Sequence, residues 1–171
     1  VDAAVVVVDA TSGVEVGTER AWQILEETNL PGIIFINKLD KEGVDINKAI
    51  ADIKDRFSRK AMAITSQDAP DLVEAIAESD DKLLEKYLGG EKLSAEELSH
   101  GLRQAVIKLN IFPMVSGSGL IDKGVEELLN AIVAYLPSPT ERPKIEAIDT
   151  LNPENKKEIV FKEDAPFSAF V

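Results

Sequence analysis

The sequence predicts an α/β protein with a doubly wound parallel sheet. Two apolar, β-branched runs at 3–8 and 33–36 indicate strands that are buried on both faces. Shorter apolar runs at 61–65 and 111–115 predict two further strands, and segments with helical spacing lie between them. Strands that alternate with helices form parallel sheets with right-handed crossovers. Ligands of such sheets bind beyond the carboxyl ends of the strands.

Two helices are expected in the first third of the chain. The first is predicted to begin near Thr18 and Glu19 and to turn Trp22 and Leu25 toward the core. Asp45 is a predicted N-cap of the second helix, because apolar residues recur at helical spacing directly after it. Each helix would pack against the sheet and connect one strand to the next.

A helical insertion is predicted at about 66–110. Apolar residues over 72–88 indicate one long or broken helix, with Ser79 or Asp80 as the cap of a second piece. Ser94-Ala95-Glu96-Glu97 is a capping box that begins another helix.

The last predicted helix runs from Val125 to Leu136, with Leu129 among its apolar residues, and is halted by Pro137-Ser138-Pro139. Residues 140–164 are polar and punctuated by proline, which indicates a linker with at most one or two edge strands. The final residues, 165–171, are expected to begin a further strand. Because the sequence opens directly on a strand without an initiator Met, it is interpreted as an excised piece.

Composition limits the classes of function. The net charge of −12 argues against direct nucleic-acid binding by this chain through phosphate neutralisation. The chain has no cysteine, which excludes disulfides and thiolate metal sites and fits a reducing, cytoplasmic compartment. No apolar stretch approaches the length of a membrane span, so no membrane partner is expected.

A polar loop follows the second predicted strand and matches the N-K-x-D pattern that recognises guanine. The Asp40 carboxylate can accept from both the ring N1–H and the exocyclic N2 amine of guanine. Asn37 can bond the ring N7, and the aliphatic stem of Lys38 can lie along the base or ribose. Asn and Asp are also common in turns and caps, so the pattern alone leaves both interpretations open.

A second loop, Ser116-Gly117-Ser118-Gly119-Leu120, follows the strand at 111–115. Small residues allow a backbone N–H to approach the guanine O6 closely. In isolation, a generic glycine-serine turn is the better explanation of this loop. Both loops at strand ends of one sheet, in this order, favour a guanine site, predicted at Asn37, Lys38, Asp40, Ser118, Gly119 and Leu120.

No catalytic residue and no metal ligand are predicted. The sequence has no Gly-Lys dipeptide and therefore lacks the phosphate-binding G-x-x-x-x-G-K-[ST] loop. The D-x-x-G letters at 40–43 overlap the guanine loop and are not taken as a second nucleotide motif. His100, the single histidine, is interpreted as a surface residue of the insertion. The acidic run Glu78, Asp80 and Asp81 is interpreted as a solvated helix face.

Several segments together resemble elongation factor G. They are distributed along nearly the whole chain and comprise 5–10, 13–16, 18–19, 35–40, 81–90, 117–118, 124–125, 135–139 and 165–169. The resemblance implies that 1–139 is the C-terminal part of a P-loop GTPase domain with the helical insertion. It implies that 140–171 is a linker and the first strand of a following β-barrel domain.

The resemblance also implies a function for the parent protein, namely GTP hydrolysis that drives ribosomal translocation. Its ligands would be GTP or GDP, with Mg²⁺ expected only where the missing phosphate-binding half is present. The ribosome would be a partner through the full-length protein. This fragment alone is expected to be inactive.

Two departures from the elongation factor G pattern stand out. Position 119 is Gly where that family usually has Ala. The insertion carries helices but little sheet, so either it is reduced or residues are absent between about 66 and 70.

Ribosome-protection and release-factor GTPases share the same motifs, although the Leu-Pro-Ser-Pro exit at 136–139 favours the elongation-factor branch. A non-catalytic interaction fragment, whose acidic insertion binds a basic partner, is the alternative from another class.

Overall fold

The computed structural model describes residues 1–64, 69–138, 141, 145–148 and 156–159. The chain forms two compact units, which apart from the first residues comprise Ala3–Leu136 and Pro137–Val171. The larger unit carries the predicted site, and each unit is described by itself. The predicted domain boundary at 139/140 stays a prediction.

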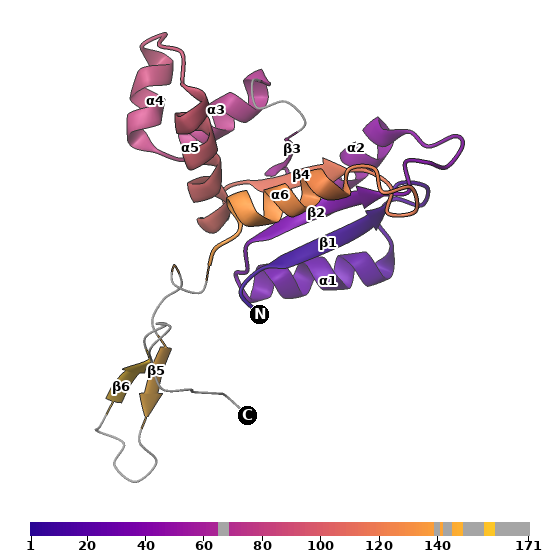
Figure 1. Cartoon of the computed structure of the whole chain (residues 1–171), viewed down its shortest axis with the longest axis horizontal. Coiled ribbons are helices and arrows are strands. Elements are labelled where there is room, and N and C mark those ends of the chain that lie inside the picture. The colour runs from indigo at the N-terminus through magenta and orange to yellow at the C-terminus, as the bar shows by residue number, and fades with distance from the viewer. Residues whose placement is uncertain (65–68, 139–140, 142–144, 149–155, 160–171) are drawn as a thin grey trace. The chain divides into compact units, whose positions relative to one another are not determined.

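The larger unit is built on a four-stranded parallel sheet with the order β1-β2-β4-β3 (Figure 1). This arrangement confirms the predicted parallel sheet. β2 and β4 lie in the centre, and β1 and the short β3 form the edges. The strands are β1 Ala4–Asp9, β2 Gly32–Asn37, β3 Ala61–Ala63 and β4 Phe112–Ser116.

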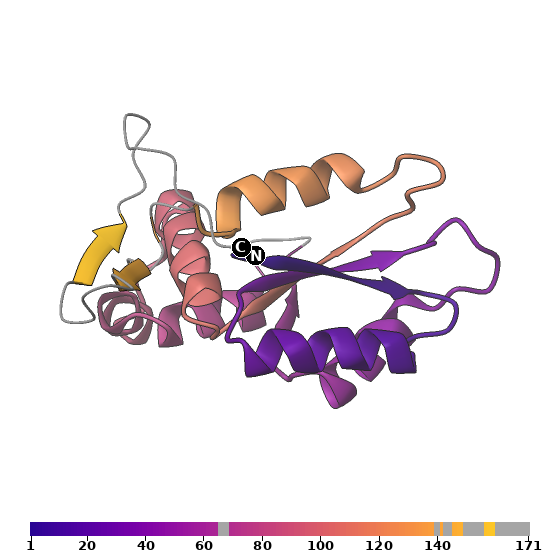
Figure 2. The same cartoon turned by 90° about the horizontal axis from the view of Figure 1, so that it is seen from below.

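Helices cover both faces of the sheet. Figure 2 shows α6 on one side and α1 and α2 on the other. Since each face has its own layer of helices, the central strands are apolar up to their last residue, and the first five residues of β2 are all buried. The helices of the sheet layers are α1 Val16–Glu27, α2 Ile46–Arg56 and α6 Val125–Tyr135.

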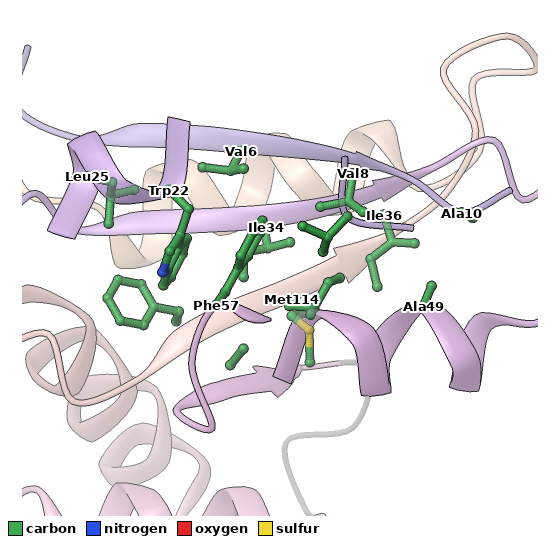
Figure 3. Packing of buried hydrophobic residues seen from close by; sticks show 14 of the residues in the cluster. Val6, Val8, Ala10, Trp22, Leu25, Ile34, Ile36, Ala49, Phe57 and Met114 are labelled. Atoms are coloured by element: carbon green, nitrogen blue, oxygen red, sulfur yellow. The ribbon is translucent and has the colours of Figure 1, made fainter. Parts of the chain in front are cut away.

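The core on the α1 and α2 face is centred on Trp22, which is 2% exposed (Figure 3). Its ring stacks on Phe57 at 4.7 Å between centroids and meets the edge of Phe112 at 4.7 Å. Val6 and Val8 of β1 are buried in the same cluster. The residues of β1 that alternate with them are exposed, Val5 by 36% and Val7 by 53%, because no described helix of the larger unit covers this part of the other face.

The described part of the insertion consists of three helices, which lie at the end of the sheet away from the polar loops of the predicted site (Figure 1). The predicted long or broken helix is two helices, because the Asp80 carboxylate caps the second by accepting from the backbone of Lys82 and Leu83. The capping box of Ser94 and Glu97 is present as predicted. The helices are α3 Pro70–Glu78, α4 Asp81–Leu88 and α5 Ala95–Ile107.

One expectation for the helices was wrong in detail. α1 begins at Val16, two residues before the predicted start at Thr18, and Glu15 in its N-cap position makes no side-chain cap. Leu129, one of the apolar residues of α6, is 57% exposed. It lies on the same helix as Val133, which is 81% exposed.

In the smaller unit, two short strands pair antiparallel, β5 Ile145–Ile148 with β6 Lys156–Ile159. This agrees with the one or two edge strands expected in the linker.

The strand expected at 165–171 and the gap expected at about 66–70 lie, wholly or largely, outside the described residues. Among the described helices, none is long and apolar enough to cross a membrane.

Candidate functional site

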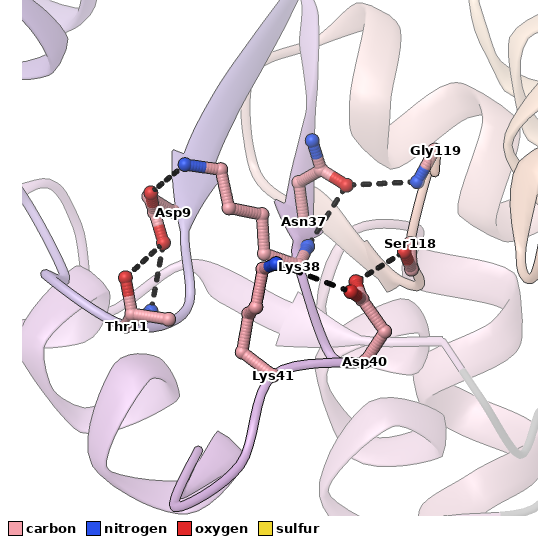
Figure 4. A network of polar contacts seen from close by, with 8 residues as sticks. All are labelled: Asp9, Thr11, Asn37, Lys38, Asp40, Lys41, Ser118 and Gly119. Carbon is pink, nitrogen blue, oxygen red and sulfur yellow. Dashed lines mark hydrogen bonds and ion pairs between the residues drawn. The ribbon is translucent and has the colours of Figure 1, made fainter. Parts of the chain in front are cut away.

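The parallel register brings the ends of three strands together. Asp9 at the end of β1 is the partner of Asn37 at the end of β2, and Ile36 of β2 is the partner of Ser116 of β4. The backbones remain bonded beyond the strands, since Leu39 N–H donates to the Gly117 carbonyl at 3.0 Å. The polar residues of all three ends therefore form one network (Figure 4).

Asn37 joins the two predicted guanine loops. Its Oδ1 accepts from the backbone N–H of Gly119 at 2.9 Å and of Lys38 at 2.8 Å. The Lys38 backbone has a left-handed φ of 69°, and the bond to Oδ1 helps to hold it there. The Asn37 side-chain amide nitrogen makes no hydrogen bond to a described residue and so can donate to a ligand.

Asp40 is held from the same second loop. Its Oδ1 accepts from the Ser118 hydroxyl, and this bond is the main reason why the pKa of Asp40 is lowered. Its Oδ2 lies 3.9 Å from the Lys41 ammonium, a long and partly exposed ion pair. Asp40 is therefore an ionised acceptor with one oxygen weakly engaged.

Ser118 itself is 1% exposed and sits in a tight loop. Its backbone exchanges hydrogen bonds with Lys123 at 2.8 and 3.1 Å. A Cβ on Gly117 would lie 2.1 Å from the Lys123 carbonyl oxygen, and Gly124 has a φ of 77°. Glycine at both positions thus permits the close backbone contact that orients Ser118.

The other two predicted residues of this loop, Gly119 and Leu120, differ in whether their backbone N–H is already bonded. The Gly119 N–H is engaged with Asn37, whereas the Leu120 N–H makes no hydrogen bond to any described residue. The Leu120 side chain is 78% exposed. All six predicted residues thus lie in one region, and the Gly119 N–H is part of the same network.

Sequence reasoning missed Asp9. Its Oδ2 accepts from the Lys38 ammonium at 2.5 Å, and its Oδ1 accepts from the backbone and hydroxyl of Thr11 at 2.8 and 2.6 Å. These bonds, that of Lys38 first, lower the pKa of Asp9 to about 2, and the same pair raises the pKa of Lys38. The sequence did hold one signal that could have found it. Asp9 ends the apolar strand that comes before the N-K-x-D strand in the chain.

The loop that follows Asp9 is fixed at its other end by α2. The Asp52 carboxylate accepts from the backbone N–H of Val14 at 2.7 Å and pairs with Arg56 at 2.9 Å. Gly13 has a φ of 71°, and a Cβ there would lie 2.5 Å from Asp52 Oδ2. Asp9 is thus presented by a loop that is bonded at both ends.

The remaining candidates stay apart from this site. His100 is exposed on α5 in the insertion, and Asp80 serves as a helix cap. The described residues contain no group of three or more His, Cys, Asp or Glu side chains that could hold a metal ion.

Residues 1–138 match the family model of the elongation factor Tu GTP binding domain. This chain belongs to that family. Its parallel α/β sheet is accordingly part of a P-loop GTPase domain of the translation-factor type. Domains of this family bind guanine nucleotides, as the description of the family states.

A solved structure of a protein from Thermus thermophilus is similar to the chain, with 32% sequence identity and a TM-score of 0.73. The match covers 82% of this chain but only 27% of the Thermus protein. The chain thus spans about a quarter of the length of the Thermus protein.

Proposed function

We propose that this chain supplies the guanine-recognition half of the nucleotide site of a translation GTPase. The observation that carries the proposal is the convergence of Asn37, Asp40 and Ser118 at the carboxyl ends of the central strands. Asn37 accepts from the Gly119 N–H, and Asp40 accepts from the Ser118 hydroxyl. Two loops far apart in the sequence are thereby held as one rigid surface.

Each group on this surface has a counterpart on guanine. The ionised Asp40 accepts from the N1–H and N2 amine, and the unbonded amide nitrogen of Asn37 donates to N7. The backbone at 119–120 donates to O6, for which the Leu120 N–H is available. The Lys38 stem lies along the base or ribose.

The phosphates and Mg²⁺ would be held elsewhere. The sequence has no Gly-Lys pair for a phosphate loop, and in such sites Mg²⁺ is held together with the phosphates. We therefore assign phosphate binding, Mg²⁺ and the hydrolytic step to residues outside this chain.

The assignment is tested by Asp40→Asn. We expect the chain to prefer GMP over AMP in an NMR titration, and the variant to lose on the order of tenfold in GMP affinity while gaining affinity for XMP. The reason is that the amide donates to xanthine O2, whereas it opposes the N2 amine of guanine. Glu42→Gln removes a charge from the same loop and is the matched control. Unchanged GMP and XMP affinities in Asp40→Asn would refute the assignment.

For the full-length protein we propose GTP hydrolysis on the ribosome, as in elongation factor G. Support comes from the family of the domain and from the resemblance at 81–90 and 135–139. GTP turnover should rise when ribosomes are added, and a translocation assay separates this function from ribosome protection and peptide release. Turnover that is indifferent to ribosomes would contradict the proposal.

A further inference from the structure

The Lys38 ammonium has more than one carboxylate within electrostatic reach. It bonds Asp9, and weaker attraction from Glu15 and Asp40 also acts on it. Asp40 is the carboxylate that the proposed function assigns to the base. A lysine that paired with Asp40 would compete with guanine for the same acceptor oxygens.

The geometry directs Lys38 away from this competition. The side chain runs from the end of β2 across to the end of β1, where its ammonium lies 2.5 Å from Asp9 Oδ2 (Figure 4). Asp9 is the less exposed partner, at 20% against 50% for Lys38. It is also fixed in place, because Thr11 donates twice to its other oxygen.

The consequence is visible at Asp40. Its Oδ1 is bonded by Ser118, and the only ion pair of Asp40 among the described residues is the long one from Oδ2 to Lys41. Lys38 is two residues from Asp40 in the chain but points to the opposite side of the loop.

We infer that Asp9 is a positioning residue for guanine specificity. It holds the Lys38 ammonium on the β1 side, so that the lysine stem is stretched along the site and Asp40 remains free to accept from the base. The inference rests on the proposed function. It concerns a residue outside the N-K-x-D loop, contributed by the neighbouring strand.

The test compares GMP with IMP, which lacks the N2 amine that Asp40 would bind. NMR titrations of the whole chain give the ratio of the two affinities. Asp9→Asn keeps an acceptor for Thr11 but removes the charge that holds Lys38. We expect the GMP-over-IMP ratio to fall about two- to fivefold, the range of a partly exposed ion pair. Asp55→Asn removes an exposed carboxylate of α2 outside the site and should leave the ratio unchanged.

A double-mutant cycle separates positioning from a general structural effect. With Lys38→Met there is no ammonium to release, so adding Asp9→Asn should change the ratio by less than about twofold. The pKa of Lys38, followed by NMR without nucleotide, should fall in Asp9→Asn because its main partner is lost. The inference alone is overturned if Asp9→Asn lowers the GMP-over-IMP ratio equally in the wild type and in Lys38→Met. It is also overturned if Asp9→Asn leaves this ratio unchanged. A wild-type chain that does not distinguish GMP from AMP overturns the proposed function and the inference with it.

Discussion

Gly117 and Gly119, two residues apart in the loop after β4, differ in the space that surrounds them. A Cβ on Gly119 would meet only Asn37 Oδ1, at an ordinary 3.8 Å, and its φ lies outside the left-handed region. A Cβ on Gly117 would collide with the backbone of Lys123 at 2.1 Å.

We expect Gly119→Ala to stabilise the chain by about 0.4–1 kcal/mol, because the unfolded state loses conformational freedom. Gly117→Ala should destabilise it by more than about 1 kcal/mol, since the backbone must move apart. Urea unfolding measures both. Equal effects of the two substitutions would show that the loop is not packed as described.

The convergence of Asn37, Asp40 and Ser118 was largely predictable at this scale, because their two loops follow strands of one predicted sheet and match known guanine-recognition patterns. That these residues bind guanine stays a prediction. Asp9 was not predictable in the same way, because its role depends on the parallel register that sets it opposite Asn37. The use of the Gly119 N–H by Asn37 also required three-dimensional geometry.

At the scale of elements, Glu97 ties two helices of the insertion together. It closes the capping box of α5 and forms an ion pair with Lys86 of α4. The bond from Lys86 is the main reason why the pKa of Glu97 is lowered from 4.5 to about 2.

This lowered pKa predicts a pH dependence. Between pH 4.5 and about 2 the unfolded state binds the proton and the folded state does not, so stability from Glu97 is complete above this window and is lost as pH falls through it. Glu97→Gln should destabilise the chain at about pH 7, and the difference from wild type should shrink toward about pH 2. Urea unfolding across this range measures it, with Glu96→Gln as the control for charge in the same turn. A difference that stays constant with pH would contradict the role of the ion pair.

Element types were predicted more reliably than element ends. The capping box and the Asp45 cap are local signals, and both are present in the structure. The start of α1 was misplaced because Glu15 makes no side-chain cap there, which left no local signal at Val16. The division at Asp80 was left open because apolar spacing continues on both sides of it.

For the whole molecule, β1 is an edge strand with exposed valines. Val5 and Val7 are open to solvent, and one side of the strand has no neighbour in the sheet that the described residues form. Unpaired apolar edges promote association between chains. We expect the chain to self-associate at high concentration and to bind a hydrophobic dye.

Val7→Lys should weaken this association, because a charged side chain on an edge strand opposes pairing. Val133→Lys places the same charge on an exposed residue of α6 and is the control for net charge. Sedimentation at several concentrations measures both. A wild-type chain that sediments as a monomer at every concentration and does not bind the dye would count against association through β1.

The charge and motif content of the whole chain predict weak binding of GTP. Triphosphate affinity comes chiefly from a phosphate loop, a lysine and Mg²⁺, and the loop motif is absent from the sequence. Contacts to the base alone should give a millimolar dissociation constant, about 4 kcal/mol. Calorimetry that returned a micromolar constant, or phosphate release above a buffer control, would show that the chain contains a phosphate site of another kind.

The position of β4 has a consequence for the order in which the molecule assembles. β4 comes last of the four strands in the chain, yet it lies between β2 and β3 and is the only described strand that pairs with β3. A growing chain that has reached Ile107 therefore has one pair of strands and a third strand without a neighbour. Arrival of residues 112–116 joins them, and Ser118, which follows directly, then reaches Asp40. The four described strands and the proposed surface for the base therefore come together only after β4 has been made, so we expect a chain that ends before β4 to show no preference for guanine.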